Sequence, residues 1–132
     1  IETAGGMNIA KELQGQWTPV TMEQVVAWDP DVIILSNFDP IQPVDLFEDK
    51  LEGQNWKNIK AVREGRVYKA PIGLYRWDAP CVETPLMIKW IAQKLHPDVF
   101  NDYRLTDDLR GFYEKFFSYT LTDADLKMIL HE

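Results

Sequence analysis

The chain has 132 residues, about the size of one domain, and 45% of them are hydrophobic, which is enough for a core and too much for a disordered segment. With 21 acidic and 14 basic residues the formal net charge is −7, which argues against a nucleic-acid-binding protein. No apolar stretch approaches the roughly 20 residues that span a bilayer. The single cysteine, Cys81, rules out an internal disulfide and a cysteine zinc site.

The first predicted elements are a short helix and a buried strand. Thr21, with Gln24 three residues later, forms a capping box that starts the helix. Asp29 ends it, because a residue before proline avoids the helical conformation. Residues 32–35, Val-Ile-Ile-Leu, are a continuous apolar run without alternation, which is typical of a strand covered on both faces in a parallel sheet.

In the middle of the chain, helices are again predicted before a strand, from less distinct sequence patterns. We expect a helix over residues 43–51, a turn or short helix over 56–62, and a tight turn at Gly65 before a second strand over 67–70. Two strands, each followed by a loop and a helix, predict an α/β fold. We expect a three-layer sandwich, with a mostly parallel central sheet flanked by helices, formed by residues 1–132 as a single domain.

The last third of the chain is predicted to be helical. Thr84 and Pro85 mark the start of an almost wholly apolar helix that runs to Leu95 and should be nearly buried. Thr106 opens a further helix, and Thr122 caps the last one. In the helix that follows Thr106, large apolar side chains recur every three or four residues and are expected to be core: Leu109, Phe112, Tyr113, Phe116 and Phe117.

The loop after the second strand carries side chains suited to a ligand, because open α/β sheets bind ligands outside the carboxyl ends of their strands. Tyr75 and Trp77 can stack on a large conjugated ligand, while Arg76 offers donors to a carboxylate, catecholate or oxyanion. Gly73 permits a turn or a close approach of the backbone. The alternative is that Trp77 closes the end of the core while Arg76 pairs with Asp78 or another acid in solvent.

The loop after the first strand contributes Asn37 and Phe38 to the same candidate site. Asp39 in this loop and Asp78 in the other are the candidates for an acid–base pair, so an enzyme is an alternative from another class of function. Paired loop aspartates are far more often turn formers, however. No other pattern in the chain requires an enzyme.

Four stretches of the chain, in order, resemble one known family. They are AGGMNIAKE from Ala4, WTPVTMEQVVAWDPDVIIL from Trp17, WKNIKAVREGRVY from Trp56 and KWIAQKLHPDVF from Lys89. With the closing FYEKFFSYTLTDADLKMIL, they are similar to the second lobe of the extracytoplasmic substrate-binding proteins of ATP-binding-cassette importers for ferric siderophores, haem and cobalamin. The resemblance covers almost the whole chain, and it identifies the family more sharply than the ligand.

This resemblance implies a protein of two α/β lobes joined by one long rigid helix, with the ligand in the cleft between them. The chain would be the C-terminal lobe, without the N-terminal lobe and the linking helix, of a monomer in the periplasm or lipid-anchored at the cell surface. Its ligand would be an iron complex, first of all a ferric siderophore, delivered to the membrane permease. Haem, cobalamin and a molybdate-type oxyanion are the alternatives, and no cofactor other than the bound chelate is implied.

The family also implies roles for particular residues. Glu23 corresponds to the glutamate that docks into an arginine pocket of the permease. Five residues of the two loops would line the ligand cleft: Asn37, Phe38, Tyr75, Arg76 and Trp77.

A stand-alone interaction module without a small ligand is the remaining alternative for the function of the chain. An apolar patch outside the cleft would favour it.

Overall fold

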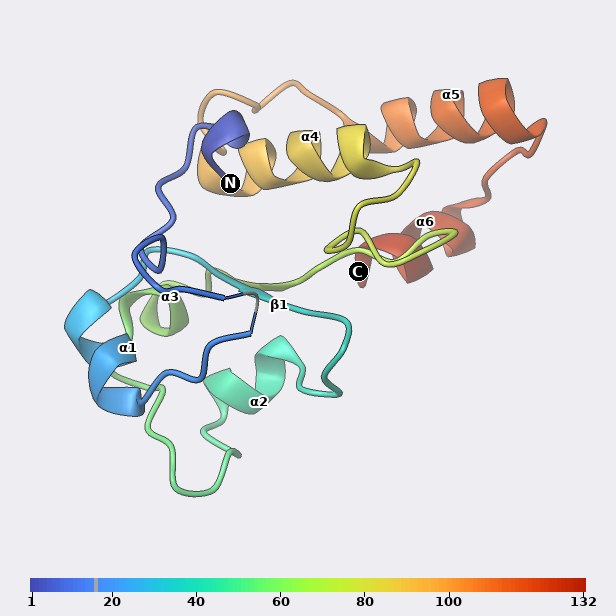
Figure 1. The fold of residues 1–132 in the computed structure, drawn as a ribbon. Helices are drawn as coiled ribbons and strands as arrows, with labels where there is room; N and C mark the ends of the chain where they lie inside the picture. The colour runs from blue at the N-terminus through green and yellow to red at the C-terminus, as the bar shows by residue number, and fades with distance from the viewer. Residues whose placement is uncertain (16) are drawn as a thin grey trace. The chain divides into compact units, whose positions relative to one another are not determined.

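The computed structural model describes residues 1–15 and 17–132, and the chain divides into two compact units (Figure 1). Met7–Lys69 form one unit, which contains both strands and is called here the sheet unit. Ile1–Gly6 together with Ala70–Glu132 form the other, called the helical unit.

The described part of the sheet unit is built on two parallel strands, β1 (Ile33–Leu35) and β2 (Val67–Lys69). Leu35 lies opposite Lys69 in the register, so both strands end at the same edge of the sheet. α2 (Pro43–Phe47) contacts both β2 and α3 (Lys60–Arg63). The helices of this unit are α1 (Met22–Trp28), α2 (Pro43–Phe47) and α3 (Lys60–Arg63).

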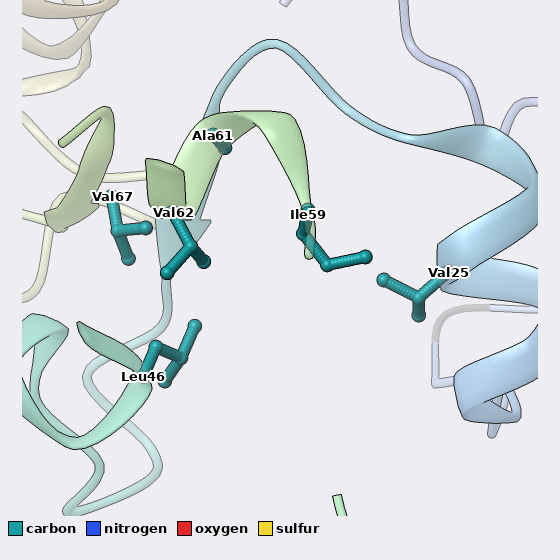
Figure 2. Packing of buried hydrophobic residues seen from close by; sticks show 6 residues of the cluster. All are labelled: Val25, Leu46, Ile59, Ala61, Val62 and Val67. Atoms are coloured by element: carbon teal, nitrogen blue, oxygen red, sulfur yellow. The ribbon is translucent and has the colours of Figure 1, made fainter. Parts of the chain in front are cut away.

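A cluster of buried apolar side chains holds the sheet unit together (Figure 2). Val25 of α1 points toward Ile59, and Leu46 of α2 lies beside Val62 of α3. Because these side chains come from all three helices and meet the strand residue Val67, burying them fixes the helices against β2. The strand ends, and the loops that leave them, are thereby anchored.

The sequence predicts both ends of α1 correctly. The Thr21 hydroxyl accepts a hydrogen bond from the N–H of Gln24 (3.3 Å), and the Gln24 side chain accepts one from the N–H of Thr21 (2.9 Å), which confirms the capping box. At the other end Asp29 adopts a left-handed conformation with φ of 40°. Its carboxylate accepts a hydrogen bond from the N–H of Lys60 (2.7 Å), which ties the end of α1 to the start of α3.

The helix predicted over residues 43–51 is shorter than expected and ends at Phe47. Asp49 has a left-handed backbone, with φ of 56°, and its carboxylate accepts a hydrogen bond from the N–H of Trp56 (3.2 Å). The prediction was wrong because a contact between residues seven positions apart leaves no trace in helical periodicity.

In the helical unit, α4 (Thr84–Leu95) contacts the short 3₁₀ helix η1 (Glu2–Ala4) and α5 (Leu105–Phe117). The N–H of Ile72 donates to the carbonyl oxygen of Ile129 (3.0 Å), so the segment after Ala70 lies along α6. α4 was predicted to be nearly buried, but it buries one face only, with Leu86, Met87, Trp90 and Ile91. The longer helices described in this unit are α4 (Thr84–Leu95), α5 (Leu105–Phe117) and α6 (Asp123–Leu130).

The predicted helix starts of this unit are partly confirmed. The Thr122 hydroxyl accepts a hydrogen bond from the N–H of Asp125 (3.2 Å), and the Asp125 carboxylate accepts one from the N–H of Thr122 (2.8 Å), which makes a second capping box. The N-cap of α4 is Glu83, one residue before the predicted Thr84. α5 starts at Leu105, one residue before the predicted Thr106.

The aromatic stripe of α5 is only partly core. Leu109 and Tyr113 are buried, but Phe116 and Phe117 are exposed, so the prediction was wrong for these two rings. They pack against Phe112 of the same helix, with ring centroids 5.0 and 5.9 Å away. α5 buries one face only, and side chains at the edge of a buried face stay in contact with solvent.

The order of strands and helices confirms the predicted α/β class with a parallel sheet. β1 is followed by α2, and β2 is followed by a loop and α4. None of the helices formed by the described residues is long and apolar enough to cross a lipid bilayer.

Candidate functional site

The loop that follows β1 is shaped by its own polar side chains. The N–H of Phe38 donates to the Ser36 hydroxyl (3.1 Å), and the N–H of Ile41 donates to the Asp39 carboxylate (2.9 Å). Such bonds between a short polar side chain and the backbone two residues away stabilise a sharp turn. The turn leaves the Phe38 ring 62% exposed and Asn37 half-buried, directly after the end of β1.

Trp17, which was not among the predicted site residues, contacts this loop. Its ring is 70% exposed and meets the Phe38 ring edge to face, with centroids 5.1 Å apart. Two large rings that pack on one another and remain mostly exposed form an apolar surface that a ligand can cover. No local pattern links Trp17 to a loop so distant in sequence. The sequence offered one indication of its role: Trp17 is a large aromatic residue outside the predicted helix.

The loop around Tyr75 folds back on itself within the helical unit. Ile72 and Arg76 form an antiparallel bridge, and the N–H of Trp77 donates to the carbonyl oxygen of Pro71 (3.0 Å). This pairing puts Tyr75 near the tip of the turn, where its ring is exposed.

Trp77 lies in the core of the helical unit. Its side chain is only 2% exposed, and its indole N–H has no hydrogen-bond partner among the described residues. A ring enclosed in this way has no free face for stacking on a ligand. Of the two interpretations of Trp77, the structure favours the one in which the ring closes the core, and Trp77 then supports the loop from within.

Arg76 lies beside Tyr75 and Asp78, and its side chain is only 17% exposed. The guanidinium carbon lies 5.6 Å from the centre of the Tyr75 ring, a cation–π geometry. The Nε of Arg76 lies 3.9 Å from an Asp78 carboxylate oxygen, at the long end of the range for an ion pair. The result is an exposed aromatic ring with a largely covered cation beside it, and the positive charge there favours an anion that also has an apolar face.

A buried carboxylate, Glu83, holds the Tyr75 loop in place. Glu83 is 0% exposed, and its two oxygens accept hydrogen bonds from the N–H of Tyr75 (3.2 Å) and from the Tyr113 hydroxyl (2.5 Å). Burial, together with the bond to Glu83, raises the pKa of Tyr113 above its ordinary range, so the hydroxyl remains a donor. The close approach expected at Gly73 is confirmed, because a Cβ there would lie 2.1 Å from a Glu83 oxygen.

Glu23, the predicted docking residue, is exposed in the first turn of α1. Hydrogen bonds from its own backbone N–H and from the Thr21 side chain lower the pKa of the Glu23 carboxyl. The carboxylate is therefore charged at neutral pH and is open to a cation that approaches from solvent.

The two aspartates of the catalytic alternative have local structural contacts. Asp39 closes the turn after β1 through its bond to the N–H of Ile41, and Asp78 lies beside Arg76. Over residues 1–15 and 17–132, no group of three or more histidine, cysteine or carboxylate side chains is placed to hold a metal ion.

Parallel strands with exposed loops at their ends define an α/β protein with candidate ligand loops, and similarity to known proteins gives its family. The family described as periplasmic binding protein matches residues 1–72, more than half of the chain. The chain therefore belongs to the periplasmic binding protein family. One relative, the molybdate-binding protein MolA of Haemophilus influenzae, is 30% identical over 118 residues, which are 89% of this chain and 32% of MolA.

Solved structures of related proteins agree with this assignment. A periplasmic solute binding protein from Veillonella parvula is 62% identical with a TM-score of 0.92, and the match covers 97% of this chain and 39% of that one. An ABC transporter solute binding protein from Sulfurospirillum deleyianum is 30% identical with a TM-score of 0.69, over 86% of this chain and 33% of that one. The structure of MolA bound to molybdate also has a TM-score of 0.69, over 92% of this chain and 36% of that one.

The chain spans between 32% and 39% of the length of these relatives. It matches a single lobe of a periplasmic binding protein, as the sequence resemblance implied.

Proposed function

We propose that residues 1–132 fold as the C-terminal lobe of the solute-binding component of an ATP-binding-cassette importer. The family match and the similarity to the Veillonella protein support this assignment. The component works outside the cytoplasm, in the periplasm or lipid-anchored at the cell surface, and passes its ligand to the membrane permease.

The proposed ligand is an anionic, metal-containing solute, and the observation that carries this is the Arg76 guanidinium against the exposed Tyr75 ring. A ferric catecholate siderophore has both aromatic faces and negative charge, so it would use the ring and the cation together. In the sheet unit, the exposed rings of Phe38 and Trp17 form an apolar surface of their own that suits the same kind of ligand.

A molybdate-type oxyanion is the second candidate. It is supported by the name of a relative that is 30% identical over 89% of this chain and is called a molybdate-binding protein. A small oxyanion would use the Arg76 donors and would gain little from exposed aromatic rings. The two candidates therefore differ in how much they depend on Tyr75.

A titration of the complete protein with a ferric catecholate siderophore, molybdate, haemin and cobalamin, followed by tryptophan fluorescence and calorimetry, tests this proposal. We expect Arg76→Gln to weaken binding of the anionic ligand by about tenfold or more, because a charge-assisted hydrogen bond is lost. Arg104→Gln, which removes an exposed arginine of the same unit, is the matched control and should bind as the wild type does.

Tyr75→Ala separates the two candidates. A siderophore should lose affinity in this variant, whereas molybdate should bind nearly unchanged. If none of the four compounds binds the wild-type protein below the millimolar range, the proposed ligand class is wrong.

We further propose that Glu23 docks on the permease. Its exposure, its charge and its place at a helix N-terminus support that role. Glu23→Gln should lower ligand uptake into cells while leaving ligand affinity unchanged, and Glu52→Gln, at another exposed glutamate of the sheet unit, is the control. Equal uptake by the two variants would contradict the docking role.

A further inference from the structure

Lysine 69 is an unusual residue for the last position of a strand. Among the described residues, the only buried charged side chains are Lys69, which is 6% exposed, and Glu83. Lysine is almost never fully buried unless its ammonium group has partners, because removing a charge from water is costly. Glu83 holds the Tyr75 loop. The groups that the Lys69 ammonium binds indicate a corresponding role for its charge.

The ammonium group of Lys69 is bound entirely by backbone carbonyl oxygens of the loop that follows β1. Its Nζ donates to the carbonyl oxygens of Ser36 (2.8 Å), Asp39 (2.6 Å) and Ile41 (2.8 Å). An ammonium group has three N–H donors, so its capacity is fully used. Because Lys69 lies opposite Leu35, its side chain starts beside the last residue of β1, where the loop begins.

These three bonds determine the course of the loop. They gather carbonyl groups from three positions of a six-residue segment onto one point, which no single uncharged side chain with one or two donors could do. With its carbonyl oxygens turned toward Lys69, the loop carries the Phe38 ring outward, where it meets Trp17. The exposed face of the loop is therefore set by a group that is itself buried.

We propose that Lys69 is a positioning residue for solute binding: its ammonium group, held by the carbonyl oxygens of Ser36, Asp39 and Ile41, fixes the loop that presents Asn37 and Phe38 to the ligand. This inference rests on the proposed function for the identity of the loop as a ligand surface. The placement of the loop by Lys69 can nevertheless be measured without any ligand.

Chemical rescue tests the inference directly. Lys69→Ala, made in the complete protein, removes the equivalent of a propylammonium ion from the side chain. Hydrogen exchange of the Phe38 and Ile41 amides then reports on the loop, since each amide donates to a side chain within the loop in the wild type. We expect their exchange to accelerate about tenfold or more, with β1 and α2 unchanged, and we expect added propylammonium to reverse the effect.

Three controls make the result specific. Propanol has the same chain without the charge and should not rescue, and tetramethylammonium has the charge without N–H donors and should not rescue either. Lys57→Ala removes an exposed lysine of the same unit and should leave the loop amides unchanged. Lys69→Met keeps most of the side-chain volume without the donors, so it provides the same test if Lys69→Ala does not fold.

A second experiment measures the affinity of the wild-type protein and of Lys69→Ala for a ferric catecholate siderophore and for molybdate. The probe that binds the wild-type protein should bind Lys69→Ala about tenfold more weakly and should recover with propylammonium. Unchanged loop exchange in both variants, or equal rescue by propanol, would overturn the role of Lys69. If the loop responds as expected and neither probe binds the wild-type protein, the proposed ligand is wrong while the placement of the loop by Lys69 stands.

Discussion

Replacing Gly73 by alanine adds one methyl group beside the buried pair of Glu83 and Tyr113. An ideal Cβ at this position lies 2.1 Å from a Glu83 carboxylate oxygen and 2.5 Å from the Tyr113 hydroxyl oxygen. Both distances are far shorter than any van der Waals contact, so at least one of the two side chains has to move. Neither can swing into solvent, because Glu83 is fully buried and Tyr113 is nearly so.

The expected loss of stability in Gly73→Ala follows from the hydrogen bonds that are broken when Glu83 or Tyr113 moves. Glu83 accepts one hydrogen bond from the Tyr113 hydroxyl and one from the N–H of Tyr75. A hydrogen bond to a charged group contributes about 1.5–3 kcal/mol, and a buried carboxylate that loses it gains no water in exchange. We therefore expect Gly73→Ala to lower the free energy of unfolding by about 3 kcal/mol.

Gly111→Ala is the matched control, because the same substitution should there have the opposite sign. Gly111 lies within α5, and a Cβ built on it meets no atom within 4 Å. Alanine in place of glycine inside a helix should stabilise the protein by about 1 kcal/mol. Urea denaturation of the two variants and the wild type, followed by circular dichroism and tryptophan fluorescence, measures both effects.

A double variant separates the contact from other causes. With Glu83→Ala in the background, the space beside Gly73 is open on that side, so Gly73→Ala should cost at least about 1 kcal/mol less than it does alone. A Gly73→Ala variant as stable as the wild type would refute the close packing of this loop. An undiminished cost in the Glu83→Ala background would show that the carboxylate is not the obstacle.

Two further predictions concern stability. Thr122→Ala removes the N-cap of α6 and should lower the free energy of unfolding by about 1 kcal/mol. Thr122→Ser retains a capping hydroxyl and should therefore keep most of this stabilisation. Hydrogen bonds from Lys89 and Tyr103 lower the pKa of the Asp108 carboxyl, so its stabilising contribution is present above its unfolded pKa and is lost as the pH falls through the lower folded value. Asp108→Asn should therefore flatten the acid side of the stability profile in urea titrations, and an unchanged profile would contradict this role.

The sequence by itself determined the elements whose bonds are local. The Thr21–Gln24 box of α1 and the Thr122 cap of α6 could be recognised from the order of residues, because the groups that they bind lie only three residues away. The same holds for β1, whose continuous apolar run needs no distant partner to be identified. The end of α2 was misjudged for the opposite reason, because it depends on a bond to Trp56.

Within the candidate loops, the sequence indicated where a ligand surface would lie but not which side chains would form it. Tyr75 and Trp77 are both aromatic and two positions apart, yet one ring is exposed and the other is 2% exposed. Whether a ring turns outward depends on the space that the neighbouring helices leave, and this space is a property of the packed unit.

Only the tertiary structure identified the two charges that hold the loops. Lys69 contacts carbonyl groups about 30 residues before it, and Glu83 contacts a hydroxyl 30 residues after it. A lysine or glutamate in a sequence is normally assigned to the surface, because burying a charge without partners is costly. Folding brings those partners together, and the burial of these charges can therefore be known only once the chain is folded.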